Sequence, residues 1–126
     1  MVPRVLVADD DMPSLTLFEG ALSLLGVEVL SATDGRECID AFRVQRFDIV
    51  FMDHLMPIMS GLEATSEIRK IENELGWSRT PIVALTASAF PSDLDALFVA
   101  GVDDILLKPY RIEELAATLE RWIHRR

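Results

Sequence analysis

Five short apolar runs, each followed by a longer segment with helical periodicity, constrain the fold of this chain more than any other feature. The runs are residues 5–8, 27–30, 48–52, 82–85 and 105–107. Nearly continuous runs of Val, Ile, Leu and Phe are typical of strands buried on both faces of a parallel sheet. The first, third and fourth runs fit this description, whereas Val27-Glu28-Val29 alternates as an edge strand does. We therefore predict five strands, with the second at an edge.

The segments between the runs carry apolar residues at helical spacing. Asp34 with Glu37, and Ser60 with Glu63, form pairs typical of helix N-termini. In the segment that starts near residue 91, the expected buried face includes Phe98. Regular alternation of strand and helix predicts parallel strands joined by right-handed crossovers. We predict an α/β fold, a three-layer sandwich with helices on both faces of a five-stranded parallel sheet in the common order 2-1-3-4-5.

Length, charge and cysteine content restrict the classes of protein to consider. At 126 residues, the segment 1–126 is expected to form a single domain. A formal net charge of −9 argues against direct nucleic-acid binding, and the basic run His124–Arg126 is expected in a last helical turn, where cations match the helix dipole. No apolar stretch approaches the roughly 20 residues that span a bilayer, and Cys38 is the single cysteine. We expect no membrane contact and a cytoplasmic location.

Polar side chains follow four of the five predicted strands. Asp9 and Asp10 follow the first, Asp53 the third, Thr86 the fourth and Lys108 the fifth. In an open α/β sheet, ligands bind outside the carboxyl ends of the strands, where the strand order reverses. The predicted order places the first and third strands side by side, so the three carboxylates should converge. Such a cluster is stable only with a cation or proton, and its oxygen ligands suit Mg²⁺.

This set of side chains matches the needs of phosphoryl transfer. The reaction requires positive charge and hydrogen-bond donors aimed at the phosphoryl oxygens, which Lys108 and Thr86 can supply. Asp53 can act as the nucleophile and form an aspartyl-phosphate. Each residue alone also fits a structural role, as a turn, a helix cap or a surface charge. Their coincidence at four strand ends favours a functional site.

Four motifs in combination resemble one protein family. They are VADDD at 7–11, MDHLMPIMSG at 52–61, ALTA at 84–87 and KP at 108–109. The chain from Val5 to about Trp122 resembles the receiver domain of two-component response regulators and hybrid histidine kinases. The resemblance implies a flavodoxin-like (βα)5 fold and a phosphoacceptor signalling switch that works by phosphorelay and turns over no metabolite.

The resemblance also implies roles for individual residues of the acidic cluster. Asp53 would accept the phosphoryl group from a phosphohistidine, the donor being a histidine kinase or a histidine phosphotransfer protein. Asp10 and Asp53 would bind Mg²⁺ directly, together with the backbone carbonyl of Leu55. Asp9 would bind the metal mostly through water. A downstream protein partner or an output domain would then read the phosphorylated state.

The switch residues implied by the resemblance are Thr86 and Lys108, which would hold the phosphoryl group. A cis peptide bond before Pro109 is implied as well. The chain departs from the pattern at Ile105, where many receivers carry Tyr or Phe, so no aromatic side chain can swing inward as Thr86 closes. The alternative function is therefore a degenerate receiver that binds proteins without being phosphorylated. A phosphatase would normally need an Asp-x-Asp loop, which residues 53–55 do not provide.

Overall fold

The computed structural model describes residues 2–123 and contains five strands that alternate with five helices. The elements are β1 (Arg4–Ala8), α1 (Met12–Leu24), β2 (Glu28–Ala32), α2 (Gly35–Val44), β3 (Ile49–Asp53), α3 (Gly61–Leu75), β4 (Ile82–Thr86), α4 (Pro91–Ala100), β5 (Asp104–Leu107) and α5 (Ile112–Ile123). All strand pairs are parallel, in the order β2-β1-β3-β4-β5. The predicted fold class and strand order are confirmed. The basic run His124–Arg126 lies outside the described residues.

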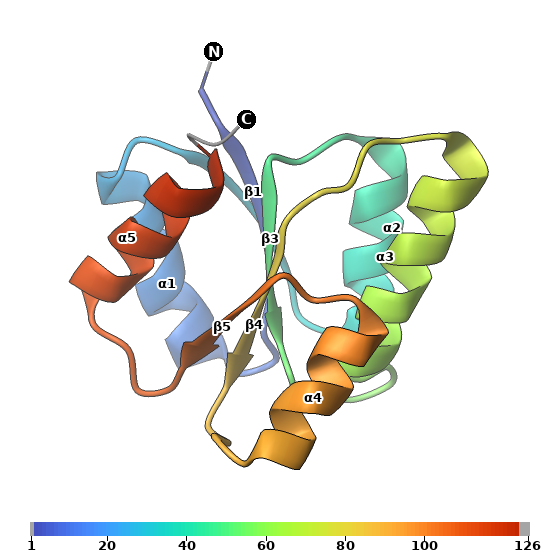
Figure 1. Cartoon of the computed structure of the whole chain (residues 1–126). Coiled ribbons are helices and arrows are strands. Elements are labelled where there is room, and N and C mark those ends of the chain that lie inside the picture. Colours follow the sequence, from blue (N-terminus) through green and yellow to red (C-terminus); the bar gives the residue numbers. More distant parts are fainter. Residues whose placement is uncertain (1, 124–126) are drawn as a thin grey trace.

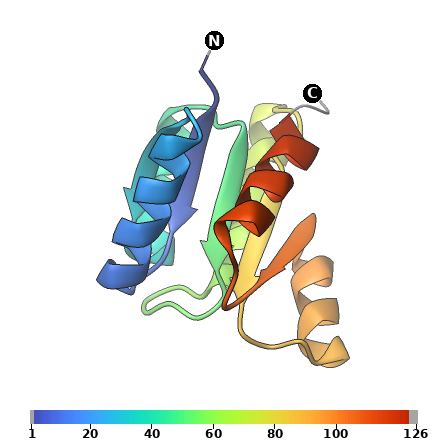
Figure 2. The same cartoon turned by 90° about the vertical axis from the view of Figure 1, so that its left-hand side faces the viewer.

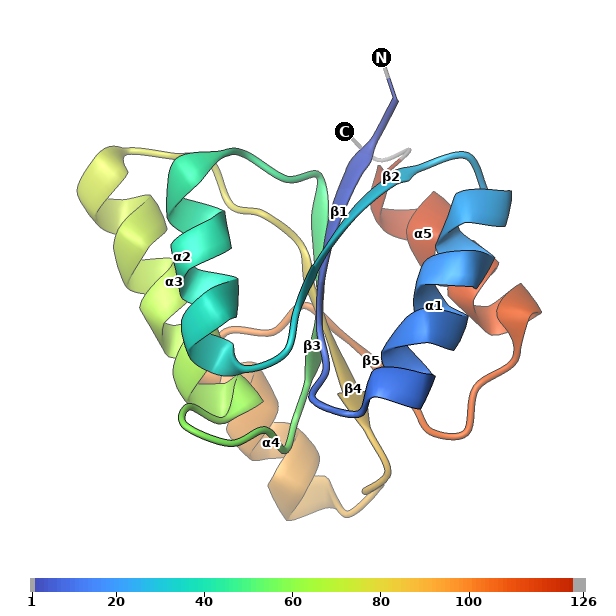
Figure 3. The same cartoon turned by 180° about the vertical axis from the view of Figure 1, so that it is seen from behind.

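The sheet is covered by helices on both faces, which produces the three layers. Helices α1 and α5 lie on one face, and α2, α3 and α4 lie on the other (Figure 1). Each face has its own apolar core, one built around Phe42 and Ile68 and the other around Phe18 and Phe51. The edge position of β2 is visible from behind (Figure 3), and its side chains alternate in exposure as its sequence predicted.

The carboxyl ends of the strands and the loops that follow them gather at one end of the molecule (Figure 2). The register pairs Ala8 with Met52 across β1 and β3, so the residues that follow these positions are neighbours. Asp53 and Thr86 are the last residues of β3 and β4. The sequence predicted that both would directly follow their strands. The fold thus brings the polar residues at the strand ends to one edge of the sheet.

Helix caps fix the entry of the chain into α2 and α3. Ser60 and Glu63 form a complete capping box at the start of α3, as predicted. At α2, Asp34 accepts from the backbone N–H of Glu37 at 2.8 Å. The Glu37 carboxylate does not close a box on Asp34, because it accepts from the backbone and hydroxyl of Thr33 instead.

Helix α4 packs less closely on the molecule than its sequence predicted. Among its residues, all of which the structure describes, Leu97 alone is fully buried. Phe98, expected on the buried face, is 48% exposed. A residue next to a buried one is turned by about 100° around a helix, so a contact through Leu94 and Leu97 leaves Phe98 outside. None of the described helices is long and apolar enough to cross a membrane.

Ile58, in the loop between β3 and α3, has a strained backbone. Its φ is 69°, and its side chain is 80% exposed. The left-handed conformation costs an L-residue about 1–2 kcal/mol, and a β-branched residue fits it poorly. We expect Ile58→Asn to raise the free energy of unfolding by about 1 kcal/mol in urea denaturation, since Asn tolerates this conformation. Leu55→Asn, an equally exposed position of the same loop without positive φ, is the control and should not share the gain.

Candidate functional site

Three carboxylates from two neighbouring strands form the centre of the site. Asp9, Asp10 and Asp53 each offer an oxygen, and these atoms all lie within 4.8 Å of one another. Asp9 and Asp53 are 2% and 7% exposed, whereas Asp10 is open to solvent. Asp9 Oδ1 accepts from the backbone N–H of Asp11 at 3.0 Å, which fixes its orientation. The predicted convergence of the three carboxylates is therefore found in the structure.

Close packing of the β3–α3 loop shapes one wall of the site. Gly61 begins α3, and its backbone N–H donates to His54 O at 3.0 Å. A Cβ atom at Gly61 would collide with the backbone carbonyl of Asp53, so the loop can turn back this tightly only with glycine. Gly35 likewise receives the backbone of Met59 where a side chain would not fit. The loop that carries Leu55 is thus held close against the end of β3 and the start of α2.

Lys108 brings a positive charge directly to the cluster. Its Nζ lies 2.9 Å from Asp53 Oδ1 and 4.0 Å from Asp9 Oδ2, and its side chain is 30% exposed. Its backbone N–H donates to Thr86 O at 2.8 Å, which ties the end of β5 to the end of β4. The Lys108–Pro109 peptide bond is cis, the isomer that the resemblance implied. Residues at the carboxyl ends of three strands therefore meet at Asp53.

The environment of Asp53 opposes its ionisation. Burial is the largest cause and raises the pKa of this carboxyl above its usual range, and the charges of Asp9 and Asp10 raise it further. The hydrogen bond and charge of Lys108 act in the opposite direction. An oxygen-only cluster with two buried carboxylates and a net negative charge fits a divalent cation such as Mg²⁺, which would offset the repulsion. The donor set of the site is consistent with the predicted metal.

The raised pKa of Asp53 predicts how its replacement changes stability. Because the folded state binds the Asp53 proton more tightly than the unfolded state, this contribution to stability is lost as the pH rises above 3.8, the ordinary value, through the folded pKa. Asp53→Asn removes that loss. We therefore compare the free energies of unfolding of the two metal-free proteins in urea. The value for the variant minus the value for the wild type should increase between about pH 4 and neutral pH.

Addition of Mg²⁺ is the control for this prediction. A cation that binds the folded state at a hundred times its Kd adds about 2.7 kcal/mol to stability. We expect this gain in the wild type and a smaller one in Asp53→Asn, because the variant lacks one of the carboxylates. A stability difference between variant and wild type that stays constant or falls between about pH 4 and neutral pH without metal would contradict the prediction.

The remaining predicted site residues surround this centre. Thr86 is 3% exposed, and its Oγ1 accepts from the backbone N–H of Ser88 at 3.1 Å. Ile105 is partly buried and packs against the core under α2, α3 and α4. The side chain of Leu55 is 75% exposed, and ligation by its backbone carbonyl stays a prediction.

A groove of about 540 Å³ lies beside the site, between α1 and the β5–α5 connection. Leu17 and Phe18 line one side, Pro109 and Tyr110 the other, and Lys108 reaches into it. The rings of Phe18 and Tyr110 meet edge to face at 5.7 Å. Burial, with the nearby charges of Asp9 and Asp53, raises the pKa of Tyr110 to about 12. Sequence reasoning missed Tyr110, although it directly follows the Lys-Pro motif.

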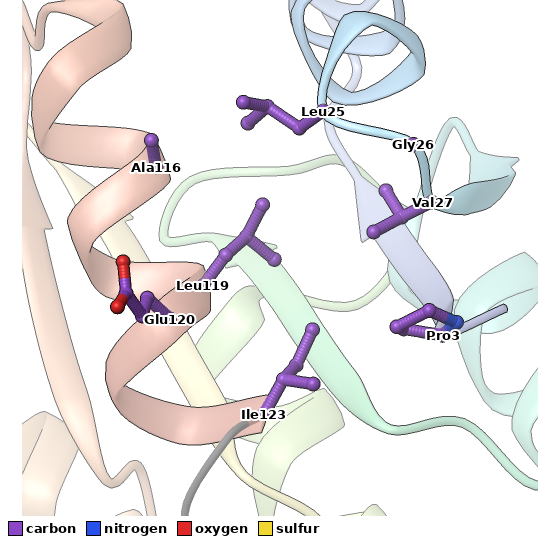
Figure 4. A pocket seen from close by; sticks show the side chains of 8 residues that line it. All are labelled: Pro3, Leu25, Gly26, Val27, Ala116, Leu119, Glu120 and Ile123. Carbon is purple, nitrogen blue, oxygen red and sulfur yellow. The ribbon is translucent and has the colours of Figure 1, made fainter. Parts of the chain in front are cut away.

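A second hollow, of about 360 Å³, lies between α5 and the connection from α1 to β2. Leu119 and Ile123 of α5 face Leu25 and Val27 across it (Figure 4). Glu120 is its one acidic lining residue in the described chain, so no cluster of carboxylates forms there. The chemistry of the site is confined to the edge of the sheet that carries Asp53.

The fold and the acidic site together define a class of signalling module. A family model described as the response regulator receiver domain matches residues 5–120. The chain belongs to this family. It therefore has the receiver fold with the acidic pocket of Asp9, Asp10 and Asp53 intact.

Relatives of known kinds contain this domain as part of longer chains. The chain is 39% identical over 120 residues to the sensor histidine kinase GacS of Pseudomonas protegens. The aligned part covers 95% of this chain and 13% of that protein. It is 36% identical over 124 residues to the transcriptional regulatory protein PrrA of Mycobacterium tuberculosis, covering 98% of this chain and 51% of that one. The chain thus spans an eighth to a half of these relatives.

Two solved structures with the same fold bear on the site. The receiver domain of the sensor histidine kinase PA1611 of Pseudomonas aeruginosa has a TM-score of 0.89 at 36% identity, over 98% of this chain and 99% of that one, and has a magnesium ion coordinated in its active site cleft. A chain of the Saccharomyces cerevisiae co-crystal of the histidine phosphotransfer protein Ypd1 with the receiver domain of Ssk1 has a TM-score of 0.89 at 27% identity. The match covers 97% of this chain and 90% of that one.

Proposed function

We propose that residues 1–126 form one receiver domain that accepts a phosphoryl group on Asp53 in a Mg²⁺-dependent reaction. The observation that carries this proposal is the contact of Lys108 Nζ with Asp53 Oδ1, at 2.9 Å, inside a cluster of three carboxylates. Such an arrangement keeps a carboxylate nucleophile and a positive charge at the same point. The donor is a histidine kinase or a histidine phosphotransfer protein, as for the Ssk1 receiver that was crystallised with Ypd1.

The transfer exchanges one bond to phosphorus for another. An oxygen of Asp53 attacks phosphorus in line with the phosphohistidine nitrogen, and the pair of electrons of the P–N bond leaves with the donor imidazole, which departs as neutral histidine because its other ring nitrogen carries a proton. Mg²⁺ held by Asp10, Asp53 and the Leu55 carbonyl would neutralise charge on the phosphoryl oxygens. Lys108 then pairs with the phosphoryl group, and the hydroxyl of Thr86 donates to it. These contacts exist only after transfer, so they stabilise one conformation over the other.

The conformational change would be read on the face formed by α4 and β5. This face carries exposed apolar side chains, among them Phe98, Val99 and Leu107. A downstream protein or an output domain that binds this face would respond to the phosphorylation of Asp53. The relatives include both a sensor kinase and a transcriptional regulator, so the output is set by the protein that contains the domain.

Incubation with acetyl phosphate tests the proposal. We expect a gain of one phosphoryl mass by intact-protein mass spectrometry, dependent on Mg²⁺, in the wild type and not in Asp53→Asn. A degenerate receiver is the second candidate, because Ile105 replaces the aromatic switch side chain. That candidate predicts no mass gain and no spectral shift with beryllofluoride. Labelling that persists in Asp53→Asn would also contradict the proposal.

We further propose that a helix of the phosphohistidine donor docks in the groove beside Lys108. Lys108, whose Nζ lies 2.9 Å from Asp53 Oδ1, lines the groove, and one wall carries Leu17, which is 76% exposed. Leu17→Glu places a charge in the docking surface and is expected to slow phosphotransfer from a histidine phosphotransfer protein about tenfold, since burial of a leucine side chain contributes about 1.5–3 kcal/mol. Phosphorylation by acetyl phosphate should be unchanged. Leu24→Glu, exposed on the same helix outside the groove, is the matched control.

A further inference from the structure

Ser88 connects the switch residue to helix α4. It lies two residues after Thr86, in the loop between β4 and α4, and its backbone N–H donates to Thr86 Oγ1 at 3.1 Å. Its hydroxyl donates to Asp93 Oδ2 at 2.5 Å and accepts from the backbone N–H of Phe90 at 3.3 Å. Three hydrogen bonds therefore meet at one residue, which links the hydroxyl of Thr86 to the first turn of α4.

The start of α4 relies on this residue because the side chain of the N-cap residue cannot accept a hydrogen bond. The N-cap is Phe90, an apolar residue whose side chain is 72% exposed. The Ser88 hydroxyl instead accepts from the backbone N–H of Phe90 and donates to Asp93, the acidic residue of the first turn. At the opposite end of the helix, the carbonyl of Gly101 accepts from Arg69 at 2.8 and 3.0 Å. The two ends of α4 are thus held by different contacts.

The contacts of α4 make its N-terminal end the part that can move. Leu97 is the one fully buried residue of this helix, and every residue of the helix is described. Its C-terminal end is fixed by a guanidinium group that is 15% exposed. Its N-terminal end is held through Ser88 and Asp93, both partly open to solvent, and through Leu94, which packs only partly buried against the core. Because Ile105 carries no aromatic ring, the direct route from Thr86 to α4 is the loop itself.

We propose that Ser88 and Asp93 are a positioning pair that stabilises the unphosphorylated arrangement of the β4–α4 loop. When Thr86 turns to the phosphoryl group on Asp53, it gives up its contact with Ser88, and the Ser88–Asp93 hydrogen bond is released with it. A contact present in one of two states biases their populations by its own free energy. Loss of the pair therefore makes the phosphorylated arrangement more accessible. This inference rests on the proposed function and assigns a role to residues outside the metal and phosphoryl site.

Binding of beryllofluoride, a mimic of the phosphoryl group, tests the pair. In the presence of Mg²⁺, we expect Ser88→Ala and Asp93→Ala each to bind beryllofluoride about three- to tenfold more tightly than the wild type, which corresponds to one hydrogen bond. Binding is followed by NMR chemical shifts of backbone amides. Asp93→Asn keeps an oxygen acceptor for Ser88 and should remain near the wild type. Asp95→Ala removes the same charge from the same helix outside the contact and is the matched control.

The outcomes separate this inference from the proposed function. Equal or weaker binding by both alanine variants, with a wild type that binds beryllofluoride, overturns the positioning role and leaves the proposed function intact. No binding by the wild type overturns both. A purely structural role would lower the Tm of the variants without tightening their binding, and that result also overturns the inference. Effects of the double variant that are no larger than those of either single variant support a shared contact.

Discussion

Replacing Lys108 by Met is expected to slow phosphorylation of Asp53 by acetyl phosphate at least about a hundredfold, the usual cost of removing one group that stabilises charge in a transition state. The side-chain Nζ lies 2.9 Å from the nucleophilic carboxylate, so its charge acts at the point where phosphorus arrives. Met keeps most of the length and the apolar stem of the side chain but removes the charge and the hydrogen bond to Asp53. The rate is measured by mass spectrometry under saturating Mg²⁺.

Lys70→Met is the matched control for Lys108→Met. Lys70 carries the same charge on α3, but its side chain is 67% exposed and pairs with Glu67 at 3.4 Å on the surface. Its replacement should leave the rate of phosphorylation unchanged. Circular dichroism of both variants excludes loss of the fold as the cause. A Lys108→Met protein that is phosphorylated at the wild-type rate would show that the lysine serves packing alone.

The architecture and the centre of the site were predictable because each depends on a local pattern. Strands buried on both faces are almost wholly apolar, so β1, β3 and β4 were recognisable in the sequence. Parallel strands end at the same edge, so residues such as Asp9, Asp53 and Lys108 had to meet there once the strand order was known. The boundaries were less certain, and Asp53 ends its strand where a loop position was expected.

Other features depend on contacts that no local pattern reveals. The exposure of Phe98 follows from how α4 sits on its neighbours, which helical periodicity alone does not specify. The strain at Ile58 could not be expected, because Gly or Asn is the usual signal for positive φ and Ile gives none. The contact of Ser88 with Asp93 depends on the path of one loop. These features required the three-dimensional structure.

Arg69 forms a partly buried network that also has no counterpart in a sequence pattern. Its guanidinium donates to Glu72 Oε1 at 2.8 Å, to Asp103 Oδ2 at 2.7 Å and to the carbonyls of Thr80 and Gly101. Asp103 lies 34 residues away along the chain. The side chains of Glu72 and Asp103 are 7% and 14% exposed, so the Arg69 guanidinium neutralises carboxylates that water reaches poorly. The network joins α3 to the loops that precede β4 and β5.

Replacing Arg69 by Met is expected to lower the free energy of unfolding by about 3–5 kcal/mol, because it leaves buried Glu72 without a cation and partly buried Asp103 with only the exposed Arg79. Arg79→Met is the matched control. Arg79 also pairs with Asp103, at 2.8 Å, but its side chain is 56% exposed, and loss of such a surface pair costs about 1 kcal/mol or less. Urea denaturation of both variants at neutral pH measures the difference. A loss in Arg69→Met no larger than in Arg79→Met would show that solvent satisfies the carboxylates, and that the network holds α4 and β5 in place without stabilising the fold.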